Sequence, residues 1–419
     1  MKIQKLLWAF PWGYRESCLF IAGVMAVGFI LQAVAGGFDF FLIHRPVNYV
    51  LAVVLLLLGL VVGRARNNAI ARWLVSVPFS VAIIGAFLVL ACIMGLVPQG
   101  NWGITGPDQP ANLLVRLGFT GLTRSWPLAL LYSLLLVSLA GVTARRFTSF
   151  SANSVLFLCL HGGLFLALLG AGLGAADIQR HVMHVQERAT EWRVYSDDGE
   201  ILELPIAIEL HDFDIEGYPP KLAIVDKDAG IPLPEGRPEW LQIEEKRPQG
   251  RLGDYAVTID EYIHDAVWAG GGVYKEMWMP GSSPAVRLTA LNRKTGQKFA
   301  GWVSGGTMSQ FMSSLPLSDN LAVVMAQPEP KRFVSDITVM TADDYKERLQ
   351  LEVNSPLRLG AWMVYQYGYD NRAGRLSTYS SFELVYDPWL PAVYCGLALM
   401  GAGAIMLVWR GKKKKGGAV

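Results

Sequence analysis

Six long apolar runs constrain the fold of this chain more than any other feature of its sequence. A hydrocarbon core about 30 Å thick is crossed by a helix of roughly 17 to 25 apolar residues. Runs of that kind are Cys18 to Gly36, Val47 to Val62, Val75 to Val97, Trp126 to Val142, Val155 to Ala176 and Trp389 to Trp409. The second run is the weakest, because it is short and begins beside Pro46 and Asn48. A composition of 52% hydrophobic and only 17% charged residues agrees with a membrane protein.

The distribution of lysine and arginine predicts the orientation of these helices. If both termini are cytoplasmic, the cytoplasmic segments carry thirteen of these residues, including the cluster Lys412 to Lys415. The opposite short loops then carry three, which are Arg45, Arg116 and Arg124. Because positive residues are retained on the cytoplasmic side, the segment from Asp177 to Pro388 is expected outside the cytoplasm. The basic tail is expected to contact membrane lipid and no nucleic acid. The first apolar run lacks a convincing signal cleavage site, so we expect it to remain as a membrane anchor.

The segment from Asp177 to Pro388 has the pattern of a β domain. Stretches rich in β-branched and aromatic residues alternate with turn signals, as in LPIAIELHDFDI, DYAVTIDEYI, AVRLTALN, KFAGWVS and LAVVMAQ. AVRLTALNRKTGQKFAGWV predicts a hairpin. We therefore expect a polytopic α-helical membrane protein of about six transmembrane helices, with one large, mainly-β extracytoplasmic domain inserted between the fifth and sixth helices. The expected parts are an N-terminal transmembrane hairpin at 1–73, helices three to five at 74–176, one compact β-rich domain with its own core at 177–388, and the last helix with a basic tail at 389–419.

Cysteine and histidine residues limit the chemistry of the outer segment. The four cysteines, Cys18, Cys92, Cys159 and Cys395, all lie in apolar runs, so no disulfide framework, C-x-x-C or C-x-x-C-H motif is expected outside the membrane. His181 and His184 could face one way if the fifth helix continued through them, but further metal ligands are not apparent. His44, beside Arg45, could meet an anionic headgroup or a haem propionate, or lie at the surface without a ligand.

His161 stands alone in the apolar run VLFLCLHGGLFLALLGAGLG. A titratable ring at membrane depth is unfavourable unless it has a partner, so such a residue indicates function. The partner could be a metal, a cofactor or another helix, and a hydrogen-bonded structural imidazole is the alternative. Gly170, Gly172 and Gly174 follow in the same run, where small residues allow helices or a flat ligand to approach closely.

Several segments together resemble one known family. ACIMGLVPQG, from Ala91 to Gly100, resembles the apolar segment ending in I-P-Q of the ResB/CcsB family of cytochrome c biogenesis proteins. LLYSLLLVSLAGVTARR and LHGGLFLALLGAGLG resemble the spans that follow. PEPKRFVSDITVM, LEVNSPLRLGAWMVYQYGYD and FELVYDPWLPAVY resemble the family's F-V-S-D strand, N-x-P-L turn, Y-Q segment and last span, in order and spacing. The resemblance runs from Val75 to Trp409 and leaves out the first two apolar runs.

The resemblance implies a subunit of the System II machinery, which brings haem across the membrane and attaches it to apocytochrome c. Such a subunit works with a CcsA/ResC-like partner that carries a tryptophan-rich W-x-W-D haem motif. The resemblance implies that it is itself a non-catalytic subunit of the holocytochrome c synthase complex. It implies the bacterial cytoplasmic membrane as the location and haem b as the transported cofactor. His161 would be an axial ligand of the haem iron. Because no other histidine lies in an apolar run, the second ligand would come from the partner.

Gly162, Gly163 and His44 are further candidates for contact with the haem. Gly162 and Gly163 would clear room for the porphyrin, or would only pack helices. His44 is a weaker candidate for contact with the haem. Two other functions stay open: a b-type cytochrome anchor, which needs two in-membrane histidines for each haem, and a sensor or binding module whose helices only anchor its outer domain. The haem spectrum of the purified protein distinguishes these classes.

Overall fold

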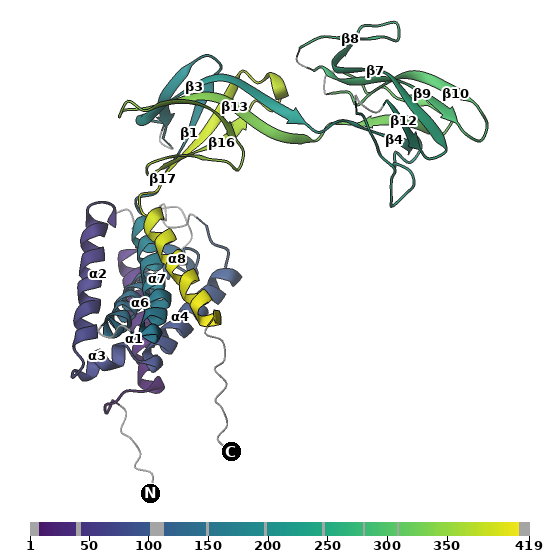
Figure 1. The fold of residues 1–419 in the computed structure, drawn as a ribbon. Helices are drawn as coiled ribbons and strands as arrows, with labels where there is room; N and C mark the ends of the chain where they lie inside the picture. Colours follow the sequence, from purple (N-terminus) through teal and green to yellow (C-terminus); the bar gives the residue numbers. More distant parts are fainter. Residues whose placement is uncertain are drawn as a thin grey trace, which may run out of the picture. The chain divides into compact units, whose positions relative to one another are not determined.

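The computed structural model describes residues 8–38, 43–100, 113–147, 151–196, 199–244, 248–279, 281–307 and 310–409. The chain divides into two compact units. The first consists of Met1–Gln179 together with Tyr386–Val419, and the second is Arg180–Val385. The first unit is helical and the second is built of β-strands (Figure 1).

Within the described residues, six helices are long and apolar enough to cross a membrane (Figure 1). They are α1 (Tyr14–Ala35), α2 (Val47–Arg64), α4 (Val77–Leu96), α6 (Trp126–Arg146), α7 (Ala152–Gly174) and α8 (Leu390–Trp409). Shorter helices are α3 (Ala69–Leu74), α5 (Leu113–Arg116) and a 3₁₀ turn at Leu122–Arg124. The six predicted runs and the predicted fold class are confirmed, and the chain is a multi-pass membrane protein.

Local sequence signals set where several helices begin. The Asn68 side chain accepts hydrogen bonds from the backbone N–H groups of Ile70 and Ala71 at the start of α3, and Ser151 accepts one from Ser154 at the start of α7. These side chains satisfy N–H groups that have no partner within the helix. Proline stands in the first turn of both α4 and α6, where its missing N–H has no cost.

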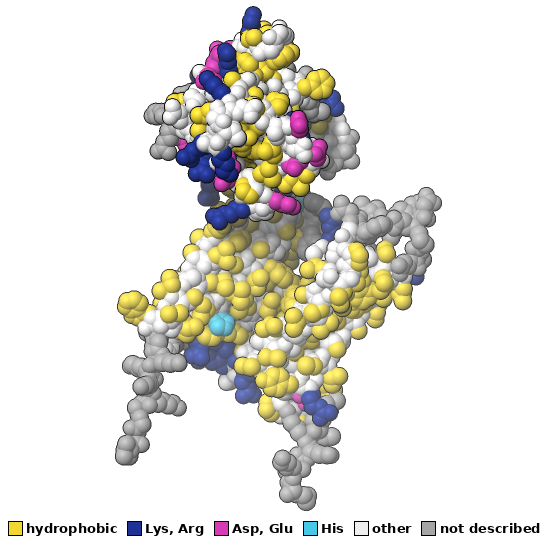
Figure 2. Space-filling model, turned by 90° about the vertical axis from the view of Figure 1, so that its right-hand side faces the viewer, with side chains coloured by type: hydrophobic (Ala, Val, Ile, Leu, Met, Phe, Trp, Pro, Cys, Tyr) yellow, Lys and Arg dark blue, Asp and Glu magenta, His cyan; other side chains and the backbone are white. Residues whose placement is uncertain are grey.

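Small residues bring the helices of the first unit into close contact. A Cβ added to Gly63 of α2 would lie 2.7 Å from the Ala144 side chain of α6. A Cβ added to Gly396 of α8 would lie 2.6 Å from the backbone oxygen of Gly163 in α7. Such contacts are typical of helix pairs in membranes, where small residues allow backbones to approach closely. Apolar side chains cover much of the outer surface of this unit (Figure 2).

The second unit contains two pairs of β-sheets, each pair enclosing its own hydrophobic core. In the first pair, one sheet has the order β1-β17-β16-β15 and the other β14-β13-β3-β2. The strands are β1 (Gln179–Gln186), β2 (Thr190–Tyr195), β3 (Ile201–Gly217), β13 (Pro330–Thr341), β14 (Lys346–Glu352), β15 (Leu357–Leu359), β16 (Trp362–Tyr369) and β17 (Tyr379–Tyr386). Their alternate side chains form a core that includes Ile208, Ile337 and Phe382, all fully buried.

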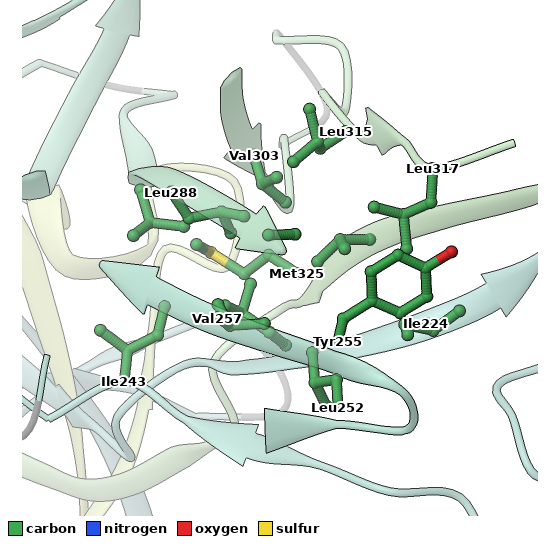
Figure 3. Close-up of a cluster of buried hydrophobic side chains, with 14 residues drawn as sticks. Ile224, Ile243, Leu252, Tyr255, Val257, Leu288, Val303, Leu315, Leu317 and Met325 are labelled. Atoms are coloured by element: carbon green, nitrogen blue, oxygen red, sulfur yellow. The ribbon is translucent and has the colours of Figure 1, made fainter. Parts of the chain in front are cut away.

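The second pair of sheets is formed by the chain between β3 and β13. Its sheets have the orders β11-β12-β4-β5 and β10-β9-β7-β6, with β8 beside β7. The strands are β4 (Lys221–Asp226), β5 (Leu241–Gln242), β6 (Gln249–Leu252), β7 (Tyr255–Trp268), β8 (Tyr274–Glu276), β9 (Ser283–Asn292), β10 (Lys298–Ser304), β11 (Leu315–Pro316) and β12 (Leu321–Ala326). Figure 3 shows side chains from both sheets, including Leu288 and Met325, meeting in one core.

The predicted hairpin is confirmed, because β9 and β10 pair antiparallel with Leu291 opposite Lys298. The outer segment forms one compact unit, Arg180–Val385, whose core is divided in two. The described residues of this unit form two large buried clusters, one in each pair of sheets. The physical reason is that β4 to β12 pair only among themselves, so their apolar faces are buried against one another.

Candidate functional site

His161 lies in the middle of α7 with its imidazole oriented by its own helix. The Nδ1 atom is 3.2 Å from the backbone oxygen of Phe157, one turn earlier. The imidazole also stacks on the Phe157 ring, with 3.8 Å between ring centroids and 9° between planes. The hydrogen bond and the stack together fix the direction in which the ring points.

The contact at Nδ1 determines what the other ring nitrogen can do. Because a backbone oxygen can only accept, Nδ1 carries the proton and donates it, and neutral His161 keeps the lone pair of Nε2 free. No hydrogen bond to Nε2 is formed within the described ranges of the chain. The side chain is half-buried. An oriented neutral imidazole with a free Nε2 is suited to bind a metal ion, and a backbone partner for the second nitrogen is common among histidine ligands.

The two glycines after His161 have different surroundings. A Cβ on Gly163 would lie 2.7 Å from the backbone oxygen of Gly396 and 2.9 Å from the backbone nitrogen of Met400. The absent side chain of Gly163 therefore makes room for α8. A Cβ on Gly162 would meet only Thr143 among the described residues, at an ordinary 3.5 Å. Packing within the described chain thus requires glycine at position 163. At position 162 it leaves room for a side chain or a ligand.

The other glycines of α7 also pack against helices. Gly170 lies against Val393 of α8, Gly174 against Trp389, and Gly172 against the Tyr132 side chain of α6. The Tyr132 hydroxyl donates to the backbone oxygen of Leu168. These contacts favour the helix-packing alternative for the three glycines over contact with a flat ligand.

His161 has no second ligand in the part of the chain that the structure describes. No group of three or more histidine, cysteine, aspartate or glutamate residues lies close enough there to hold a metal ion. His44 is exposed in the turn before α2, where its backbone oxygen accepts from the N–H of Val47 at 2.9 Å. The residues present can supply one axial ligand to an iron ion, and a second would have to come from another molecule.

Asp177 forms a buried polar cluster at the end of α7 that the sequence did not predict. Its carboxylate is almost fully buried and accepts from Asn48 at 2.8 Å, from Trp389 Nε1 at 2.9 Å and from the Arg45 backbone N–H at 3.0 Å. Arg45 Nε lies 3.4 Å from the same carboxylate, and its guanidinium donates to the Tyr386 hydroxyl at 2.8 Å. The cluster ties the starts of α2 and α8 to the end of α7.

These contacts determine the charge state of Asp177. Burial acts to raise the pKa of the carboxyl, but the hydrogen bonds from Asn48, Arg45 and Trp389 and the Arg45 charge together hold its pKa below the ordinary value. The carboxylate is therefore ionised near neutral pH. Its signal in the sequence was the set of polar residues at the ends of apolar runs: Arg45, Asn48 and Asp177.

The structure does not bring His181 and His184 together as a joint site. Such a site required the fifth helix to continue, but α7 ends at Gly174 and both histidines lie in strand β1. Residues three apart in a strand point to opposite faces of the sheet. His184 Nδ1 lies 2.7 Å from the Ser381 hydroxyl of β17. The two rings therefore do not form a joint metal site.

The motif residues of the outer unit form a buried hydrogen-bond network. Ser335, from the F-V-S-D strand, donates to Gln366 Oε1 of the Y-Q segment at 2.6 Å and lies 2.9 Å from the Ser380 hydroxyl. Gln366 Nε2 donates to Ser380 at 2.8 Å. Asn354, in the N-x-P-L turn, has a positive φ of 65°, a conformation that asparagine adopts more readily than most residues. These motif residues therefore shape the β unit.

Comparison with known proteins supports the resemblance predicted from the sequence. Residues 308–379 match the model of the ResB-like family, and this segment contains the F-V-S-D, N-x-P-L and Y-Q motifs. No curated protein matches the chain. A solved structure of the cytochrome c heme lyase CcmF aligns at 13% identity over 96% of this chain and 46% of its own length, with a TM-score of 0.23. So low a TM-score does not establish a common fold.

Proposed function

We propose, from the match of residues 308–379 to the ResB-like family, that this chain is a membrane component of cytochrome c maturation. Its six membrane-compatible helices and large β unit agree with that role. More specifically, it would act in System II with a CcsA/ResC-like partner and deliver haem for attachment to apocytochrome c. Both termini would lie in the cytoplasm and the β unit on the periplasmic side, as the distribution of lysine and arginine indicates.

The observation that carries the proposal is the geometry of His161. The hydrogen bond from Nδ1 to Phe157 leaves Nε2 as the atom that can ligate haem iron. The apolar surroundings make an imidazole without a partner costly, and an iron ion bound at Nε2 removes that cost. Because the described chain offers one such ring, the second axial ligand would come from the partner, and the bound haem would join the two subunits.

Two glycines next to His161 would contribute to haem binding, one by leaving space for the porphyrin and the other by allowing α7 and α8 to pack. The open side of Gly162 would allow a porphyrin to approach α7, whereas Gly163 would hold α7 against α8. Haem supplies the vinyl groups to which the thiols of the apocytochrome add. We assign no catalytic side chain to this protein, and attachment would be completed with the partner.

The proposal is tested by replacing His161 with glycine in the complex that co-purifies with the partner. We expect His161→Gly to lower both the haem content of the complex and the formation of c-type cytochromes, and added imidazole to restore both. Cys159→Ala is the matched control, since it removes another potential iron ligand from the same helix. Unchanged haem content and cytochrome formation in His161→Gly would overturn the assignment.

A further inference from the structure

The guanidinium of Arg146 contacts the ring of Phe157, and that ring contacts the imidazole of His161. Arg146 is the last residue of α6, and its guanidinium carbon is 5.2 Å from the centroid of the Phe157 ring. The Phe157 ring stacks on the imidazole of His161 at 3.8 Å. The guanidinium is therefore no farther from the imidazole than the sum of these two distances, which is comparable to the separation between a haem iron and its propionate carboxylates.

Arg146 belongs to a region of the helical unit that is rich in arginine. Arg64, Arg66, Arg72, Arg145 and Arg146 lie at or near the adjoining ends of α2, α3 and α6. Figure 2 shows Lys and Arg side chains gathered on the helical unit next to a mainly hydrophobic surface. In the described part of this unit the acidic residues are Glu16, Asp177 and Asp387, and each accepts hydrogen bonds elsewhere.

The arginines of this region differ in what they contact. Arg145 donates to the backbone oxygen of Ala71 at 3.1 Å, and Arg66 donates to the backbone oxygen of Arg145 at 3.3 Å. These two side chains hold α3 and the end of α2 against α6. Arg146 is exposed, and no carboxylate pairs with it in the described ranges. Its guanidinium lies over an aromatic ring, which orients it beside the His161 surface.

We infer that Arg146 binds the propionate carboxylates of the haem that His161 ligates. The inference rests on the proposed function. Guanidinium groups bind carboxylates through two parallel hydrogen bonds, and such charge-assisted bonds are stronger beside an apolar surface than in water. The propionates and the vinyl groups lie on different sides of the porphyrin. A haem held by its propionates at Arg146 therefore presents its vinyl groups toward the opposite end of α7, the direction in which attachment requires them.

The test compares haem with haem dimethyl ester, whose propionates carry no charge. Full-length wild type and each variant, in nanodiscs of zwitterionic lipid, are titrated with both compounds, and binding is measured as the change in the absorbance of the compound. We expect Arg146→Ala to weaken the binding of haem about tenfold and to leave the binding of the ester unchanged. Arg146→Lys should restore part of the affinity for haem. Arg64→Ala, which removes an exposed charge from the end of α2, should change neither.

The possible results separate this inference from the proposed function. If Arg146→Ala weakens the binding of neither compound, Arg146 does not contact the propionates and the inference is wrong. If Arg146→Ala weakens the binding of both compounds equally, Arg146 acts through the packing of Phe157 and the inference is also wrong. A loss of both compounds in His161→Gly supports ligation by His161 whatever the Arg146 variants show. Unchanged binding in His161→Gly contradicts the proposed function itself.

Discussion

The Asp177 carboxylate accepts a hydrogen bond from the Asn48 side-chain amide at 2.8 Å, which joins the end of α7 to the first turn of α2. The same amide donates to the backbone oxygen of Leu173 at 3.1 Å. Helix α2 lies outside the segment that resembles ResB-like proteins, yet it is fixed to α7 by these bonds and to α6 by Gly63. Helix α2 is therefore an integral part of the helical unit.

Removal of the Asp177 carboxylate is predicted to destabilise the helical unit. Asp177→Ala leaves the buried Asn48 amide and the Trp389 N–H without their shared acceptor, and we expect a loss of about 3 kcal/mol in the free energy of unfolding. Thermal unfolding of the full-length protein in detergent measures the effect. Asp228→Ala, at an exposed position in the outer unit, is the control. Equal stability of the two variants would show that the cluster contributes little.

The lowered pKa of Asp177 predicts how this contribution depends on pH. The folded-state pKa lies below the unfolded value of about 3.9. The stabilisation is therefore fully present above that value and is lost as the pH falls through the folded-state pKa. In unfolding measurements between neutral and strongly acidic pH, the difference between the wild type and Asp177→Asn should be constant at first and shrink only below the unfolded pKa. A difference that shrinks near neutral pH would be inconsistent with a lowered pKa.

Adjacent glycines of α7 are predicted to respond in opposite ways to a larger side chain. Gly163→Val places atoms where the α8 backbone lies, and we expect a loss of about 1–3 kcal/mol of stability. Gly162→Val meets only the Thr143 side chain of the described chain, at ordinary van der Waals distance, so the fold should tolerate it while haem binding falls. Thermal unfolding and haem titration of both variants check this. Equal destabilisation by the two substitutions would refute the distinction between the glycines.

The helices could be predicted from the sequence because length and apolar composition suffice to define a membrane span. Their ends were less accurate: α6 continues past Val142 to Arg146, since basic residues are favourable in a last helical turn. The Asp177 cluster could not be predicted, because Asn48 and Asp177 are 129 residues apart and their contact depends on how the helices pack. Asn48 lowered the apolar character of the second run and so weakened its prediction as a membrane span, although its amide is the group that contacts Asp177.

In the outer segment, too, local features could be predicted from the sequence and long-range contacts could not. Alternating residues predicted its strands and the β9–β10 hairpin, which are local features. The division into two cores depends on β3 pairing with β13 across the whole of the inserted sheets, and such long-range pairing leaves no local pattern. The position of His161 in a helix was predictable, whereas its hydrogen bond to Phe157 and its stack on that ring required the structure.

The Ser335 network is predicted to stabilise the first pair of sheets. Ser335→Ala removes the donor to buried Gln366, and an unsatisfied buried amide oxygen costs about 1–3 kcal/mol. Hydrogen exchange of the full-length protein should show faster exchange in β13 and β16. Thr289→Ala, which removes an exposed hydrogen bond to Asp260, should leave exchange in these strands unchanged. Protection of β13 equal to that of the wild type would contradict the prediction.

The most direct test of ligation by His161 is electron paramagnetic resonance of the oxidised complex that co-purifies with the partner. A haem held by His161 and a histidine of the partner gives a low-spin signal, because two imidazoles bind the iron. His161→Gly should convert this signal to high-spin, and added imidazole should restore the low-spin form. A low-spin signal that is identical in the wild type and in His161→Gly without imidazole would contradict the assignment of His161 as the ligand.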